Sequence, residues 1–101
     1  MNEDLSRKPY SVEVVNAEET EEGWRFIIRV AENDRTDEFI VRLDRDYWEK
    51  LTEGEKEPAD IARSTITFLL EREPKETLDR TVTVKDIHKR FSEFETEMNE
   101  L

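Results

Sequence analysis

The sequence predicts an α+β domain in which a three-stranded antiparallel meander is followed by about three helices packed on one sheet face. Two observations predict this class. In the first half of the chain, three segments alternate apolar and polar residues at the period of a β-strand, and after Asp44 the apolar residues recur at helical spacing. Strands and helices are therefore segregated along the chain, which is typical of α+β domains and disfavours a parallel α/β sheet.

Length and composition indicate one folded domain. The chain has 101 residues, close to the commonest domain size, and we expect a flexible N-terminal tail over residues 1–8 and a single domain over residues 9–101. Charged residues make up 43% of the chain, but apolar residues recur among them at regular spacing. This pattern favours a folded chain over a disordered one.

The net charge and the missing residue types limit the expected partners and compartment. The chain has 27 acidic and 16 basic side chains, which gives a formal charge of −11. A surface of this sign repels nucleic acid and anionic lipid, so both are disfavoured as partners. The chain also has no cysteine, no apolar run long enough to span a membrane and no export signal at its N-terminus. We therefore expect a cytoplasmic protein.

Three strands are predicted at residues 10–14, 24–30 and 38–43. The polar stretches between them, residues 16–23 and 32–37, are predicted to be chain reversals, and their shortness favours an antiparallel meander. The residues predicted to face the core are Tyr10, Val12 and Val14 in the first strand, Trp24, Phe26, Ile28 and Val30 in the second, and Phe39, Val41 and Leu43 in the third.

Three helices are predicted after the strands. Asp44 is the expected N-cap of a short helix over residues 45–51, and a longer helix is predicted from Pro58 to Arg72, where the following Pro74 stops the pattern. The last helix is predicted to begin in a capping box at residues 83–86 and to continue to the C-terminus. Its apolar residues recur at spacings of four and three and are Ile87, Phe91, Phe94, Met98 and Leu101.

Several short strings within residues 38–95 stand out as a set. They are Trp48-Glu49-Lys50-Leu51, the stretch from Pro58 to Pro74 that ends in Phe68-Leu69-Leu70-Glu71-Arg72-Glu73-Pro74, and the stretch from Val84 to Phe91. In these strings the chain resembles a group of small bacterial proteins of unassigned function. The shared positions are core and capping positions, so the resemblance implies a shared fold and no particular chemistry.

No motif in the sequence predicts catalysis or a bound cofactor. His88 has Ser92 and Glu95 four and seven residues further on, which would suit a catalytic relay, but the same spacing is typical of the solvated side of an amphipathic helix. With two glycines the chain cannot form a glycine-rich phosphate loop, and with one histidine and no cysteine it has no zinc motif. We expect no catalytic residue, no cofactor and no metal site.

One face of the predicted sheet is basic and aliphatic despite the acidic background. Arg25, Ile27 and Arg29 on the second strand share this face with Ile40 and Arg42 on the third. Two interpretations stay open. The face is either a solvated one, in which the arginines pair with Glu13 and Glu38, or a surface on which something docks.

The last helix is a second candidate surface. Three helices with broad apolar stripes cannot all be buried against three short strands, so some apolar surface is expected to stay exposed. The residues that we expect there are Phe94, Met98 and Leu101, and the expected occupant is a second copy of the chain or another protein.

These features together predict a small acidic, non-catalytic module for protein–protein interaction or regulation. It is expected to bind another protein, with the net charge favouring a basic one, or itself as a homodimer. The alternative is a nucleic-acid-associated regulator that uses the arginine-bearing sheet face. A small hydrolase centred on His88 is the remote alternative.

Overall fold

The computed structural model describes residues 10–32 and 35–100, and the predicted tail over residues 1–8 lies outside this part of the chain. Within it, the α+β class is confirmed. A four-stranded sheet has the order β1-β2-β3-β4, in which β1 (Tyr10–Glu19), β2 (Gly23–Glu32) and β3 (Arg35–Asp44) form the predicted antiparallel meander. A short fourth strand, β4 (Thr81–Thr83), was not predicted and runs parallel to β3.

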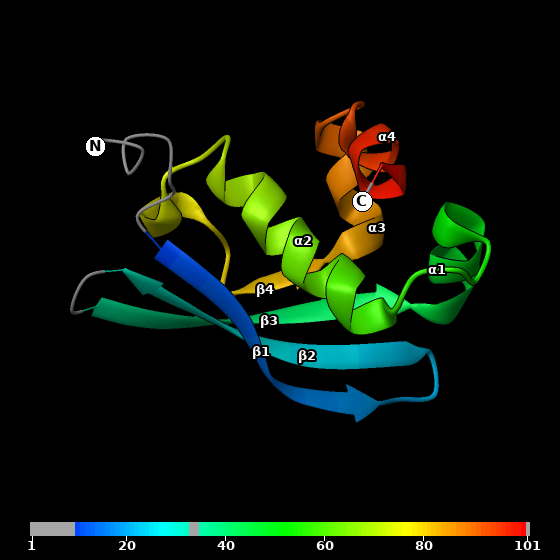
Figure 1. Ribbon diagram of the computed structural model, residues 1–101, viewed down its shortest axis with the longest axis horizontal. Coiled ribbons are helices and arrows are strands. Elements are labelled where there is room, and N and C mark those ends of the chain that lie inside the picture. The colour runs from blue at the N-terminus through cyan, green and yellow to red at the C-terminus, as the bar shows by residue number, and fades with distance from the viewer. Residues whose placement is uncertain (1–9, 33–34, 101) are drawn as a thin grey trace, which may run out of the picture.

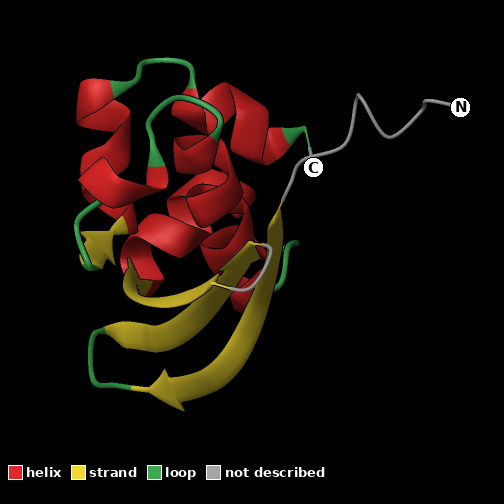
Figure 2. Ribbon diagram, turned by 90° about the vertical axis from the view of Figure 1, so that its left-hand side faces the viewer, coloured by secondary structure: helices red, strands yellow, loops and turns green. Residues whose placement is uncertain are grey.

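The helices all lie on one side of the sheet, as predicted. They are α1 (Arg45–Thr52), α2 (Pro58–Leu70), α3 (Val84–Arg90) and α4 (Phe94–Asn99), with a 3₁₀ turn, η2 (Lys75–Thr77), before β4. Figure 1 shows α2 lying across the strands, and Figure 2 shows the helices as a layer above the sheet, with none of the helices of residues 10–32 and 35–100 on its other side. None of the helices in the described residues is both long and apolar enough to cross a membrane.

All three strands of the meander run further than the sequence pattern indicates, and in β1 the reason is a bulge. Its pairing with β2 shifts between Val14 and Asn16, so Val15 is an extra residue in the ladder. A bulge reverses the alternation of faces along the strand. The apolar and polar alternation therefore stops at Val14, although the strand continues to Glu19.

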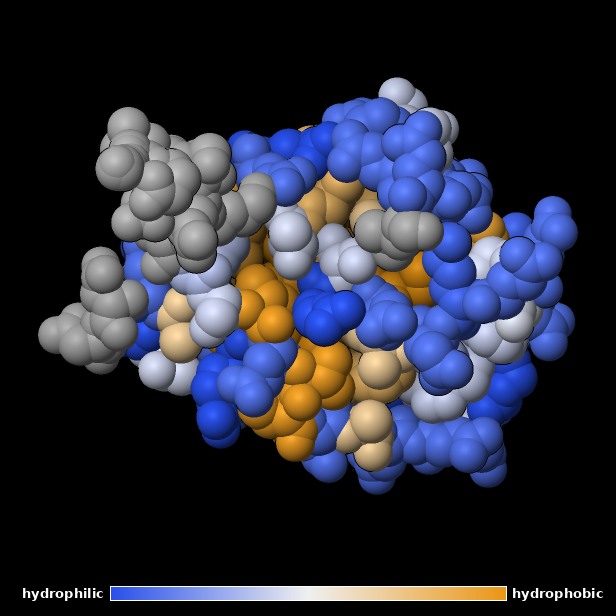
Figure 3. All heavy atoms as spheres, viewed as in Figure 1, coloured by the Kyte–Doolittle hydropathy of each residue, from blue (hydrophilic) through white to orange (hydrophobic). Residues whose placement is uncertain are grey.

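The core lies between the inner face of the sheet and the helices. Phe26, Ile28 and Val30 on β2 are buried, and so are the apolar inner-face residues of β3 and the apolar side of α2. Coverage is thinner along β1, where Tyr10, Val12 and Val14 are only partly buried. Figure 3 shows hydrophobic residues at the surface where β1 passes beside α2.

The predicted continuous helix at the C-terminus is wrong, since the structure breaks it after Arg90. Phe91 has an extended backbone, with φ −132° and ψ 102°, and α4 begins at Phe94. The break has a packing reason. The first helix of the pair, α3, packs against β3 and β4, whereas α4 packs against α1 and α2, and one straight helix could not reach both sets of partners.

The predicted side-chain caps are also not formed. Asp44 and Thr83 occupy the N-cap positions of α1 and α3, but neither side chain bonds to the helix. The Asp44 carboxylate instead lies 2.7 Å from the Lys85 ammonium, so it ties the end of β3 to the start of α3.

Candidate interaction surface

The face of the sheet opposite the helices, here called the outer face, contains all five residues that the sequence placed together. The strand register arranges the side chains around these five residues in three rows across the sheet, because residues paired directly across a ladder point to the same side. The rows are Glu13, Arg29 and Glu38; then Asn16, Ile27, Ile40 and Thr81; and then Glu18, Arg25, Arg42 and Thr83.

Two of the arginines pair with neighbouring carboxylates. Arg29 lies 3.3 Å from Glu38, which is one of the two predicted partners, and Arg25 lies 3.4 Å from Glu18. No ion pair joins Glu13 to an arginine in the described residues. All of these side chains are at least a third exposed to solvent, so the pairs contribute little to stability and hold the side chains only loosely.

Arg42 differs from its neighbours. It is exposed and forms no ion pair with any carboxylate in the part of the chain that the structure describes. In the sheet it stands directly opposite Arg25 on one side and Thr83 on the other. Two like charges are thus held side by side on adjacent strands, an arrangement that costs free energy unless an anion lies nearby.

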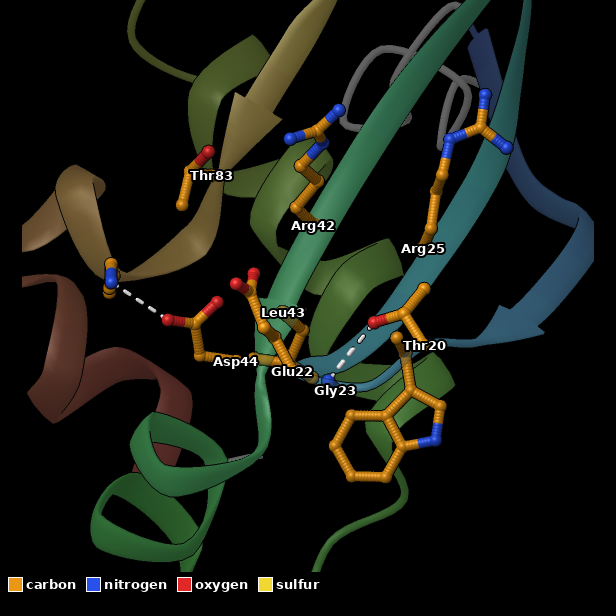
Figure 4. Close-up of a pocket in the computed structure, with 10 residues that line it drawn as sticks. Thr20, Glu22, Gly23, Arg25, Arg42, Leu43, Asp44 and Thr83 are labelled. Atoms are coloured by element: carbon orange, nitrogen blue, oxygen red, sulfur yellow. Dashed lines mark hydrogen bonds and ion pairs between the residues drawn. The ribbon is translucent and has the colours of Figure 1, made fainter.

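A hollow of about 370 Å³ opens beside this arginine pair, at the end of the sheet where β2 begins and β3 ends. Figure 4 shows Arg25 and Arg42 extending in the same direction from their strands, with Thr83 beyond Arg42. Glu22 and Asp44 line the hollow as well. The hydrogen bond from Lys85 to Asp44 raises the pKa of that lysine, and the ion pair of the two side chains offsets their charges.

Hydrogen bonds at Gly23 and at its neighbour Glu22 hold the backbone beside this hollow. The Gly23 N–H donates to the Thr20 hydroxyl at 3.1 Å, and the neighbouring Glu22 carbonyl accepts the Arg45 N–H at 2.8 Å. These bonds draw the β1–β2 turn against the end of β3. The hollow therefore sits on backbone that is held by hydrogen bonds.

The second predicted surface, on the last helix, is not available. Phe94 is 0% exposed and Met98 is 2% exposed, so both belong to the core, and Leu101 lies outside the described residues. Phe94 packs edge-on against Phe68 with ring centroids 5.0 Å apart. The apolar residues of α4 are spaced to contact α2 in the same chain, so Phe94 and Met98 offer no apolar surface to a partner.

The histidine relay considered from the sequence is not assembled in the described residues. The Tyr47 hydroxyl donates to the Glu95 carboxylate at 2.8 Å, while His88 stacks on the Tyr47 ring at 6.1 Å and lies 3.8 Å from Glu95. The pKa of Tyr47 is raised, chiefly because the side chain is partly buried and secondly because its hydroxyl donates to Glu95. Ser92 takes no part in these contacts. The cluster joins α1, α3 and α4 and has the form of a packing contact.

Sequence reasoning missed Thr83 and Lys85, which it assigned to a capping box. They join the hollow only because β4 pairs with β3, and three residues of strand are too short to recognise by alternation. Elsewhere among residues 10–32 and 35–100, no three His, Cys, Asp or Glu side chains are grouped so that they could hold a metal ion.

Comparison of the chain with protein-family models, with curated proteins and with solved structures gave no match in any of the three.

Proposed function

We propose that this protein is a non-catalytic protein-binding module and that the outer face of the sheet is its docking surface. The observation that supports this most directly is that every helix of the described chain covers the inner face, while the outer face stays open across β2 and β3. Antiparallel sheets are stable with one face in water, so the outer face is available to a partner without any rearrangement of the fold.

The composition of the outer face suits a protein partner. Ile27 and Ile40 lie directly opposite each other in its middle row and are half-buried, and the charged rows flank them. An aliphatic centre with a charged rim is the arrangement found in protein–protein interfaces, where arginine is enriched and lysine is depleted. The outer-face residues of β2 and β3 include three arginines and no lysine.

The outer face differs in charge from the rest of the chain. Its three central rows contain three arginines and three glutamates, whereas the whole chain has a formal charge of −11. A partner therefore meets less negative charge on this face than on the surrounding surface, which orients the encounter.

The test compares capture of partners by the tagged protein and by outer-face variants from lysate of the native host. The variant Ile27→Thr, Ile40→Thr removes the aliphatic centre but keeps β-branched residues in the strands. A matched control, Leu70→Thr, makes the same kind of change on the helix side, where Leu70 is also half-buried. Thermal unfolding of each variant establishes that it is folded.

We expect a protein partner that survives nuclease treatment, that the control retains and that the double variant loses. Equal recovery by the double variant and the wild type would reject the outer face as the docking surface. Recovery that disappears after nuclease treatment would favour the nucleic-acid-associated regulator instead.

A further inference from the structure

We infer that Arg25 and Arg42, together with the Thr83 hydroxyl, form a binding site for a carboxylate on an acidic segment of a partner protein. This inference rests on the proposed function, because it names the group that the outer face recognises. It depends on three observations: the strand register, the missing counter-charge of Arg42 and the lining of the hollow.

The register brings the two guanidinium groups within reach of one ligand. Directly opposed residues on adjacent antiparallel strands have Cβ atoms roughly 4.5–5.5 Å apart, and Arg25 and Arg42 are such a pair. Both side chains extend in the same direction from their strands (Figure 4). The planar fork of a guanidinium matches the two oxygens of a carboxylate, so the pair offers donors suited to that group.

The second observation is that Arg42 has no carboxylate of its own in a chain with a large acidic excess. Most other arginines on the described surface contact a carboxylate, as Arg45 does with Glu19 and Arg90 with Glu73, and Arg35 at the start of β3 is the exception. Glu18 approaches Arg25 to 3.4 Å but is 59% exposed, and no ion pair links it to Arg42. The repulsion between the two arginines is therefore only partly offset within the chain, and an external anion would offset it further.

The third observation concerns the lining of the hollow and selects the charge of the ligand. The Thr83 hydroxyl stands beside Arg42 and is not used as a helix cap, so it is free to donate to a ligand oxygen. Glu22 and Asp44 line the same hollow, and Asp44 is offset by Lys85. The lining therefore has three basic side chains, Arg25, Arg42 and Lys85, against these two acidic ones, a formal balance of +1 that one singly charged carboxylate neutralises.

The test measures binding of defined probes to the ¹⁵N-labelled full chain by NMR at low ionic strength. The probes are an end-blocked tetraglutamate peptide, inorganic phosphate and an end-blocked tetralysine peptide. The variant is Arg42→Gln, which keeps the length of the side chain and a hydrogen-bond donor but removes the charge. The matched control is Arg63→Gln, an exposed arginine on α2 that lies 3.1 Å from Asp60.

We expect tetraglutamate to shift the amide signals around Arg25, Arg42 and Thr83. Its affinity should fall about tenfold or more in Arg42→Gln, because losing a hydrogen bond to a charged group typically weakens binding by this factor. Arg63→Gln should bind as the wild type does. Equal weakening by the two substitutions, or shifts spread evenly over the surface, would overturn the site. Tighter binding of phosphate than of tetraglutamate would overturn the assignment to a carboxylate.

The two proposals fail separately. The Ile27→Thr, Ile40→Thr variant keeps both arginines, so it should still bind tetraglutamate if the anion site is correct. If the peptide binds but no partner depends on the isoleucines, only the docking proposal fails. If a captured partner depends on the isoleucines but is retained in full by Arg42→Gln, only the anion site fails.

Discussion

Gly23 occupies a position where the backbone leaves no room for a side chain. A Cβ atom at this residue would lie 2.1 Å from the Leu43 carbonyl oxygen and 2.7 Å from the Arg45 nitrogen. Both atoms belong to backbone, which cannot rotate away as a flexible side chain can. The crossing of β2 against the junction of β3 and α1 therefore requires glycine.

We expect Gly23→Ala to lower the free energy of unfolding by about 2–3 kcal/mol, because backbone has to shift to admit the methyl group. Urea denaturation followed by circular dichroism measures this loss. Gly54→Ala is the matched control. Gly54 has φ +77°, but the nearest atom to its Cβ is a Trp48 ring carbon at 4.0 Å, so only conformational strain of about 1–2 kcal/mol applies. A larger loss at Gly54 than at Gly23 would contradict this account.

Asp37 and Lys75 form the most enclosed ion pair among the described residues for which exposure is given. The Lys75 side chain is 7% exposed, and its ammonium lies 2.8 Å from Asp37 and 3.1 Å from Glu32, while Arg80 approaches Asp37 to 3.0 Å. The ion pair with Lys75, and secondly that with Arg80, lowers the pKa of Asp37. The ion pairs with Asp37 and Glu32 raise the pKa of Lys75.

The lowered pKa of Asp37 has a consequence for acid stability. A carboxyl group whose pKa is lower in the folded state stabilises the fold above its unfolded pKa, and this contribution disappears as pH falls through the folded value. We therefore expect Asp37→Asn to lower the melting temperature at pH 7 and to lessen the fall in melting temperature below about pH 4. Asp79→Asn, at an exposed site nearby, is the control and should leave both quantities close to wild type. An unchanged acid response in Asp37→Asn would count against the role of this pair.

At the scale of elements, Arg72 connects the end of α2 to α4. Its guanidinium lies 3.5 Å from the centroid of the Phe68 ring, 3.0 Å from Glu93 and 2.7 Å from Glu97. A helix of six residues is far too short to be stable alone, so α4 depends on such contacts and on the burial of Phe94.

We expect Arg72→Gln to increase hydrogen exchange in α4 several-fold, because both ion pairs and the ring contact are lost, and to leave exchange in the central strands β2 and β3 unchanged. Hydrogen exchange measured by NMR resolves the two regions. Arg63→Gln again serves as the control, since its partner Asp60 lies on the same helix. A uniform increase over the whole domain would show that Arg72 supports global stability and has no local role at α4.

At the scale of the whole molecule, the acidic excess opposes the compact state. A formal charge of −11 on a chain with a radius of gyration of 13.7 Å places like charges close together, and salt screens their repulsion. The exposed ion pairs weaken in salt as well, but each contributes little.

We expect the melting temperature to rise as NaCl is increased from about 10 mM to about 1 M, because screening removes more repulsion than attraction. Glu21→Lys, in the exposed turn between β1 and β2, makes the charge two units less negative and should raise the melting temperature at low salt and flatten the response. Glu21→Gln separates the loss of a negative charge from the gain of a positive one. A melting temperature that does not depend on salt would exclude self-repulsion as a factor in stability.

The three-strand meander and the outer-face residues on it can be predicted from the sequence, since alternation with a period of two assigns each side chain to a face wherever pairing is regular. The sequence also predicts α2, where Pro58 begins the helix and the apolar spacing of Ile61, Ile66 and Leu69 faces the core. Both results depend only on residues that are neighbours in the chain.

Four features depend on tertiary contacts and could not be predicted: the fourth strand, the break between α3 and α4, the burial of Phe94 and Met98, and the hollow beside Arg42. Apolar spacing shows that a helix side is buried, but it does not show whether the covering surface belongs to the same chain or to a partner. Likewise, the pairing of Thr83 with Arg42 joins residues 41 positions apart in sequence. It exists because parallel pairing with β3 provides hydrogen-bond partners for the backbone of β4. Long-range pairing of this kind is set by the packing of the whole domain, which no local pattern encodes.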